Sequence, residues 1–178
     1  MRSLGIAILL LLTTLYIFPS CHKQTFEEKF DQFNQKFFTK YVPEFPHSRL
    51  LTKQDIPVEQ QEYFDQNKAK LQMLQDMNQN GTLEYIICGV SDSLMQQHQR
   101  GAYFIAIFEQ TNKGIERRYL QKLMIAPVSL KPAENAEHEG VVLTFAFFSE
   151  FAAEIYYENG QYQLDRWYAS PENSEPES

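Results

Sequence analysis

The second half of the chain contains segments that are apolar on both faces, a pattern typical of buried strands in a sheet. Residues 102–109 and 141–148 are the clearest examples. Residues 151–158 alternate instead, and the Asn159-Gly160 pair after them favours a two-residue hairpin turn. The register predicted from this turn pairs Glu158 with Gln161, Tyr157 with Tyr162 and Ile155 with Leu164. Strand pairing therefore dominates the fold that we expect for this half.

The first half has helical periodicity instead. Thr25 and Glu28 have the spacing of a capping box, and the apolar residues that follow recur at helical spacing. We expect this helix to end near Tyr41, because Pro43 follows it closely. The apolar stripe consists of Phe26, Phe30, Phe33, Phe37 and Tyr41. A second helix is predicted over residues 56–77, with a thinner stripe that includes Phe64, Leu71 and Leu74.

Helical patterns followed by strand patterns predict an α+β fold. We expect two N-terminal helices packed on one antiparallel sheet of about six strands. Hydrophobic residues at 43% and charged residues at 22% suit a globular domain. The predicted division is a leader over residues 1–20, a single domain over residues 21–169 and an acidic, disordered tail over residues 170–178.

The N-terminus has the composition of an export signal. Arg2 gives it a positive charge, and residues 4–18 form an uncharged apolar run that is short for a membrane span. The run leads into Phe18-Pro19-Ser20-Cys21, with a bulky apolar residue three positions before the cysteine and a small one directly before it.

This segment resembles the lipobox of bacterial lipoprotein signals. The resemblance implies cleavage before Cys21, a lipid anchor on Cys21 as the contact with the membrane, and a place in the cell envelope. His22 after the cysteine implies the outer membrane. A plain secreted protein and an uncleaved anchor are the alternatives. If Cys21 is acylated, Cys88 has no partner for a disulfide, and we expect it to be a buried thiol in a strand.

At the boundary between the two halves, residues 76–84 carry oxygen-bearing side chains at alternate positions, with Gly81 where a calcium loop turns sharply. The loop would offer its ligands at positions 1, 3, 5, 7 and 9, the seventh through a backbone carbonyl. The predicted ligands of Ca²⁺ are Asp76, Asn78, Asn80, Thr82 and Glu84.

This D-x-N-x-N-G-x-x-E pattern resembles the calcium loops of dockerin-like and FG-GAP-type modules. Position 12 is Ile87, where a paired EF-hand has glutamate, so a switching EF-hand is excluded. Asp76 and Glu84 are the loop's formal negative charges, so any binding should be weak, on the order of 10⁻⁴ to 10⁻³ M. The alternative is a turn without an ion, held by Asx-turns at Asp76 and Asn78, with positive φ at Asn80 and Gly81.

Several function classes are disfavoured. A net charge of −7 argues against nucleic acid as a partner. Ser91 lacks the final glycine of a G-x-S-x-G elbow, and His138 has no HExxH motif around it. We therefore favour a lipid-anchored envelope protein with a binding or structural role and an unknown protein partner, rather than an enzyme. The alternatives are an inhibitor or immunity-type protein that binds an enzyme, and an envelope hydrolase assembled from distant residues such as His47, His98, Asp92 or Glu137.

Overall fold

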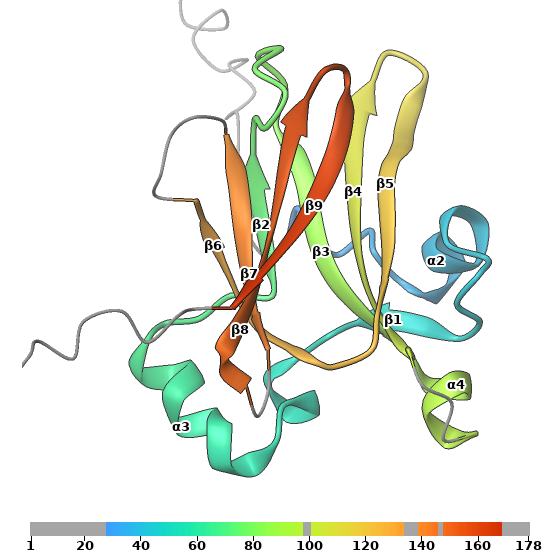
Figure 1. Ribbon diagram of the computed structural model, residues 1–178. Helices are drawn as coiled ribbons and strands as arrows, with labels where there is room; N and C mark the ends of the chain where they lie inside the picture. The colour runs from blue at the N-terminus through green and yellow to red at the C-terminus, as the bar shows by residue number, and fades with distance from the viewer. Residues whose placement is uncertain (1–27, 98–100, 134–138, 146–147, 169–178) are drawn as a thin grey trace, which may run out of the picture. The chain divides into compact units, whose positions relative to one another are not determined.

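The structure is a computed structural model, and it describes residues 28–97, 101–133, 139–145 and 148–168 (Figure 1). It separates into two units, residues 1–32 and residues 33–178. In the first unit, residues 28–32 form turns, and the Gln32 side chain donates a hydrogen bond to the Lys29 carbonyl at 3.0 Å. The strands and the helices with defined bounds belong to the second unit.

The first sheet of that unit is antiparallel and has five strands, namely β1 (Ser48–Leu50), β2 (Gln72–Gln75), β3 (Glu84–Ser91), β4 (Tyr103–Thr111) and β5 (Gly114–Leu123). Their order is β1-β3-β4-β5, and β2 pairs with the first part of β3 while β1 pairs with its last part. We call it sheet A. Its central strand β4 corresponds to the segment 102–109, which is apolar on both faces in the sequence.

The second sheet, sheet B, is also antiparallel and has four strands in sequential order, namely β6 (Pro127–Pro132), β7 (Gly140–Phe145), β8 (Phe148–Glu158) and β9 (Gln161–Tyr168). The predicted hairpin is confirmed with its register: Ile155 pairs with Leu164, Tyr157 with Tyr162 and Glu158 with Gln161. Asn159 and Gly160 have φ values of +52° and +82°, as a primed two-residue turn requires.

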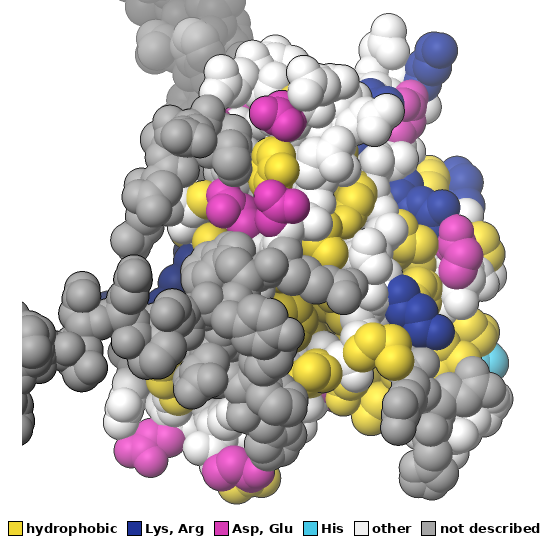
Figure 2. All heavy atoms as spheres, in the orientation of Figure 1, with side chains coloured by type: hydrophobic (Ala, Val, Ile, Leu, Met, Phe, Trp, Pro, Cys, Tyr) yellow, Lys and Arg dark blue, Asp and Glu magenta, His cyan; other side chains and the backbone are white. Residues whose placement is uncertain are grey.

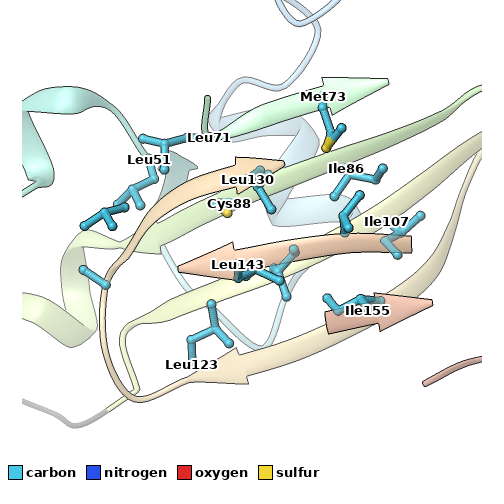
Figure 3. Close-up of a cluster of buried hydrophobic side chains, with 14 of the residues drawn as sticks. Leu51, Leu71, Met73, Ile86, Cys88, Ile107, Leu123, Leu130, Leu143 and Ile155 are labelled. Atoms are coloured by element: carbon cyan, nitrogen blue, oxygen red, sulfur yellow. The ribbon is translucent and has the colours of Figure 1, made fainter. Parts of the chain in front are cut away.

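The two sheets pack against each other through a shared hydrophobic core. Figure 3 shows Ile86 and Ile107 of sheet A beside Leu143 and Ile155 of sheet B, all four fully buried. A backbone bridge also links the segment before β2 to sheet B, because the Leu130 amide donates to the Lys70 carbonyl at 2.7 Å. The free thiol of Cys88 lies in this core on β3, as predicted, and burial raises its pKa.

The opposite face of sheet A is covered by aromatic side chains around α2 (Gln35–Tyr41). The rings of Phe33, Phe37 and Tyr41 lie 5.6, 5.1 and 6.3 Å from the ring of Phe108 on β4, measured between centroids. Phe38 packs on Phe104 of the same strand at 5.9 Å. Strand β4 is apolar on both faces because one face meets sheet B and the other meets α2.

The predicted helix over residues 25–41 is wrong over residues 28–34. Asn34 is the N-cap of α2, and its side-chain oxygen accepts the Phe37 amide at 3.2 Å, so the helix begins only at Gln35. The proposed cap at Thr25 lies outside the described residues. Phe33, Phe37 and Tyr41 still share one apolar surface, as the spacing predicted.

The second predicted helix, over residues 56–77, is also too long. A 3₁₀ turn (Lys53–Asp55) precedes α3 (Val58–Gln66), and the helix ends where Lys68 takes a positive φ of +48°. Residues 72–75 form β2 instead, because Leu71 and Met73 are buried in alternation and pair with β3. Leu71 and Leu74 are three residues apart, which also fits helical spacing and explains the error.

A single sheet of about six strands was also predicted, and that expectation is wrong. The described residues form nine strands in two sheets. Strands β1 and β2 are three and four residues long, and β6 contains two prolines, which disfavour a strand. Both prolines are at the ends of β6, where the missing amide costs no internal pairing. The α+β class itself is confirmed.

Candidate functional site

Three turns lie at the same end of the two sheets (Figure 1). They are the loop between β2 and β3, the tip of the β4–β5 hairpin and the tip of the β8–β9 hairpin. Residues of the β2–β3 loop, of strands β4 and β5 and of the β8–β9 hairpin line a pocket of about 590 Å³ at this end. We call this cavity the hairpin pocket. The residues from sheet A and its loop are Asn78, Asn80, Glu109, Arg118 and Tyr119, and those from the β8–β9 hairpin are Tyr157, Gly160, Gln161 and Tyr162.

Two buried carboxyl groups lie at this end of sheet A. Glu84 and Glu109 are direct partners in the pairing of β3 with β4, and the two residues are only 0% and 5% exposed. Like charges directly opposite each other destabilise a sheet, and buried carboxylates need compensating donors. Surrounding backbone and side-chain groups supply such donors, and the donors of Glu84 differ from those of Glu109.

Glu84 accepts hydrogen bonds from the backbone amide of Met77 at 2.8 Å and from the hydroxyl of Tyr162 at 3.0 Å. Burial outweighs these hydrogen bonds and raises the pKa of Glu84, and the charge of Asp76 adds to the effect. Glu84 is therefore enclosed beneath Tyr162 and holds that ring in place. The pKa of Tyr162 is raised in turn, by its own burial and by the charge of Glu84.

Glu109 faces the pocket. Its carboxylate accepts a hydrogen bond from the side-chain amide of Asn80 at 2.5 Å and pairs with Nε of Arg118 at 2.5 Å. Burial alone would raise the pKa of Glu109, but the donors from Asn80 and Arg118 outweigh it and hold the pKa below its usual value. Arg118 also pairs with Glu116 at 3.0 Å. Its neighbour Arg117 serves a different purpose, since it pairs with Glu44 beside α2 at 2.8 Å.

Three tyrosine rings form one wall of the pocket. Tyr162 lies between the others, 5.0 Å from Tyr157 and 6.0 Å from Tyr119 between ring centroids. Tyr119 and Tyr162 also pack against the hydrophobic core. Because Glu84 anchors the hydroxyl of Tyr162 and the core supports two of the rings, this wall is in place without a ligand.

Charged side chains are distributed unevenly around the pocket. Figure 2 shows Lys and Arg side chains over β5 and acidic side chains over the β8–β9 hairpin. Between these regions, the visible surface consists mainly of uncharged polar and hydrophobic groups. The pocket thus opens between an acidic and a basic region rather than within a field of one sign.

The loop predicted to bind calcium is closed by its own hydrogen bonds. Asp76 accepts the amides of Asn80 at 3.0 Å and Gly81 at 2.8 Å. Asn78 and Asn80 form Asx-turns, accepting the amides two residues ahead at 3.1 and 2.7 Å. Positive φ occurs at Gln79 and Gly81, so the alternative interpretation was right about Gly81 and wrong about Asn80.

The five predicted calcium ligands are brought near one another but differ in availability. Asp76, Asn78 and Asn80 accept hydrogen bonds from backbone amides of the loop itself, whereas Glu84 is fully buried and its two oxygens are engaged by Met77 and Tyr162. Within the described ranges, no three His, Cys, Asp or Glu side chains are grouped as a metal site. The residues therefore fit Ca²⁺ only in part, and calcium binding by Asp76, Asn78, Asn80, Thr82 and Glu84 stays a prediction.

The residues named for a possible hydrolase are partly brought together elsewhere. Nδ1 of His47 is within hydrogen-bonding distance of Ser93 Oγ, and the carboxylate of Asp92 binds Nε of Arg49 at 3.1 Å. Ser91 is buried and caps the short helix α4 (Asp92–Gln96), a structural role. His98, Glu137 and the predicted lipidation site Cys21 lie outside the described residues.

The sequence did not single out most of the pocket. Glu109, Arg118 and Tyr119 carry no motif, although a glutamate that ends a strand apolar on both faces was a usable signal. The Tyr157–Tyr162 pair was predicted to share one face of the hairpin, and this is confirmed. In the part of the chain with described placement, no helix is long and apolar enough to cross a membrane. No family model, curated protein or solved structure matches the chain.

Proposed function

We propose that this chain is a lipid-anchored protein of the cell envelope, on the outer membrane, which acts by binding a small molecule in the hairpin pocket. The leader supports the location, because residues 18–21 have the lipobox pattern before Cys21. The pocket supports the binding role. The observation that carries it is the pair of buried carboxyl groups, Glu84 and Glu109, held opposite each other beside a cavity.

Stability alone does not account for that arrangement. Replacing a buried ionic group by a well-packed apolar residue of similar volume is often neutral or stabilising. This end of sheet A instead keeps Glu84, Glu109 and Arg118 with donors around them. Such costly polar groups beside a concave surface are typical of binding sites. The volume of about 590 Å³ also falls within the range of roughly 300–1,000 Å³ for small-molecule pockets.

Hydrogen bonds that exist before a ligand arrives hold the lining of the pocket in place for binding. Tyr162 is fixed by Glu84, and Glu109 is fixed by Asn80 and Arg118. Side chains held in this way lose little conformational entropy when a ligand binds. Glu84 is fully buried beneath Tyr162, so Glu109 is the acidic group that a ligand in the pocket can reach.

The anchoring part is tested by the lipid attachment itself. Cells expressing the full chain are labelled with a radioactive fatty acid, and the wild type is compared with Cys21→Ser and Cys88→Ala. We expect label and membrane association in the wild type and in Cys88→Ala, and loss of both in Cys21→Ser. Membrane association that persists unlabelled in Cys21→Ser would refute the lipid anchor.

The binding part is tested by thermal-shift measurements on purified protein with neutral sugars, amino acids, short peptides and organic ammonium ions. We expect at least one class to raise the melting temperature of the wild type. The same compound should not stabilise Tyr157→Ala, in which one wall of the pocket is removed. If no compound acts through this wall, the pocket is not the functional site.

A further inference from the structure

The chemistry of the hairpin pocket narrows the class of its ligand. Resting on the function proposed above, we propose that the pocket binds a neutral saccharide, with a sugar ring lying along the tyrosine wall and its hydroxyl groups bound by Glu109, Arg118 and the side-chain amides around them. Charge, hydrogen-bonding groups, ring geometry and volume each contribute to this inference.

The charged groups that line the pocket disfavour ionic ligands. Among the lining residues, Glu109 and Arg118 are the charged ones, and they pair with each other at 2.5 Å. The lining therefore has no net formal charge. A phosphate would have to compete with Glu109 for Arg118, and an ammonium ion would have to compete with Arg118 for Glu109. A ligand without net charge leaves this ion pair intact.

The hydrogen-bonding groups suit hydroxyls. The lining combines side chains that both donate and accept, such as Asn78 and Gln161, with the acceptor Glu109 and the donor Arg118. A hydroxyl group is also both a donor and an acceptor, so one sugar can satisfy groups of each kind. The hydroxyl of Tyr157 and the amide of Gln161 make no side-chain hydrogen bond within the described part of the chain, and they are available to a ligand.

The ring geometry favours a sugar over a flat aromatic ligand. Tyr157 and Tyr162 meet edge to face at 64°, with their centroids 5.0 Å apart, and Tyr119 and Tyr162 are tilted by 47° at 6.0 Å. These rings contact each other, so no slot exists between them into which a planar base could slide. They offer instead a continuous wall, against which the C–H groups of a pyranose ring can pack.

The volume supports the same conclusion. A cavity of about 590 Å³ is far larger than a single ion or a methylated ammonium group requires. Tyr119 and Tyr162 border the hydrophobic core, whereas Gln161 is exposed at the rim. The ligand would therefore bury one ring against the tyrosines and extend toward solvent, as a disaccharide or the end of a longer chain does.

The test is isothermal titration of the purified protein with neutral disaccharides, namely cellobiose, maltose and N,N′-diacetylchitobiose, at millimolar concentrations. Glucosamine and glucose 6-phosphate serve as cationic and anionic comparisons. We expect at least one neutral disaccharide to bind more tightly than either charged sugar. Tyr157→Ala should weaken its affinity about tenfold or more, because the packing surface of one ring is lost.

Two variants make the result specific. Tyr157→Phe keeps the ring, and its affinity should stay within about threefold of the wild type, since only one hydroxyl contact is lost. Tyr63→Ala removes an exposed tyrosine of α3, away from the pocket, and should bind like the wild type. Melting curves of the variants establish that each is folded.

The saccharide assignment is overturned if no neutral saccharide binds, or if binding is unchanged in Tyr157→Ala. The proposed function, binding of a small molecule in the pocket, is judged by a separate result. If an amino acid, a peptide or an ammonium ion binds and loses affinity in Tyr157→Ala, the pocket is a binding site for another ligand class. If none of these compounds binds through Tyr157, both proposals fail.

Discussion

The hydrogen bond between Tyr162 and Glu84 should contribute measurably to stability, and Tyr162→Phe tests this. The substitution removes the hydroxyl that donates to Glu84 at 3.0 Å and leaves the ring in place. The contacts of that ring with Tyr157 and Tyr119 are kept, and no large cavity is created. Glu84 is 0% exposed, so water does not replace the lost donor without rearrangement.

The magnitude follows from the charge and burial of the acceptor. A hydrogen bond to a charged group is worth about 1.5–3 kcal/mol, and an unsatisfied buried acceptor costs a similar amount. The Met77 amide still donates to the other oxygen of Glu84, so the loss is partial. We expect Tyr162→Phe to lower the free energy of unfolding by about 2 kcal/mol at pH 7. In a domain of this size, that corresponds to a fall in melting temperature of roughly 4–8 °C.

Urea unfolding at pH 7 measures this loss, with an unchanged m-value as evidence that the folded state is intact. The matched control is Tyr63→Phe, which removes the hydroxyl of an exposed tyrosine and should change the free energy of unfolding by less than about 0.5 kcal/mol. The effect of Tyr162→Phe should shrink at acid pH, where Glu84 is protonated and needs less compensation. A variant as stable as the Tyr63→Phe control at pH 7 would refute the role assigned to Glu84.

Three further predictions concern the same region and its supports. The pKa of Glu84 is raised in the folded state, so the contribution of Glu84 to stability is complete below its unfolded pKa and is lost as the pH rises through the folded pKa. The pKa of Glu109 is lowered in the folded state, so the contribution of Glu109 is present above its unfolded pKa and is lost as the pH falls through the folded pKa. Urea unfolding between neutral and acid pH should therefore show that Glu84→Gln lowers the free energy of unfolding least at neutral pH, and that Glu109→Gln lowers it least at acid pH. If the losses in the two variants depend on pH in the same way, this reasoning is contradicted. Calorimetric titration with Ca²⁺ should give a dissociation constant on the order of 10⁻⁴ to 10⁻³ M that is lost in Asp76→Ala, and no heat and no melting shift at several millimolar would refute the calcium site. Gly89→Ala should cost about 1–3 kcal/mol in urea unfolding, because its Cβ would lie 2.2 Å from the ring of Phe104, and near-wild-type stability would contradict this close approach.

Local features of the sequence predicted the β8–β9 hairpin with its register. Asn159 and Gly160 readily adopt the positive φ values that the turn needs, and the turn fixes which residues face each other. Because these features are local, the sequence also predicted that Tyr157 and Tyr162 share one face of the hairpin. For a hairpin this short, nothing outside the segment is required to specify the pairing.

The division into two sheets depends on contacts between distant residues and could not be predicted in this way. β1 is strand-like because Leu50 pairs with Gly89, and the segment before β2 meets sheet B where Lys70 pairs with Leu130. Segments of three or four residues do not show a clear period of their own. Their conformation follows from the longer strand beside them, which a single sequence does not identify.

The pocket was missed for the same reason. Glu109 and Arg118 become neighbours through the pairing of β4 with β5, and the β8–β9 hairpin comes from the other sheet. The loop residues were noticed because their pattern is local, and Asn78 and Asn80 do line the cavity. Sequence reasoning thus located one wall of the site and assigned it to an ion, whereas the remaining walls required the tertiary structure.

The central claim is that the hairpin pocket binds a neutral saccharide, and amide chemical shifts during titrations with the three neutral disaccharides test it most directly. The amides expected to move are those of residues 78–82, 109, 118–119 and 157–162, which surround the cavity. Resonances of α3, on residues 58–66, should stay unchanged. Shifts confined to the pocket residues would establish the site, whereas shifts at α3, or none at saturating sugar, would contradict the account.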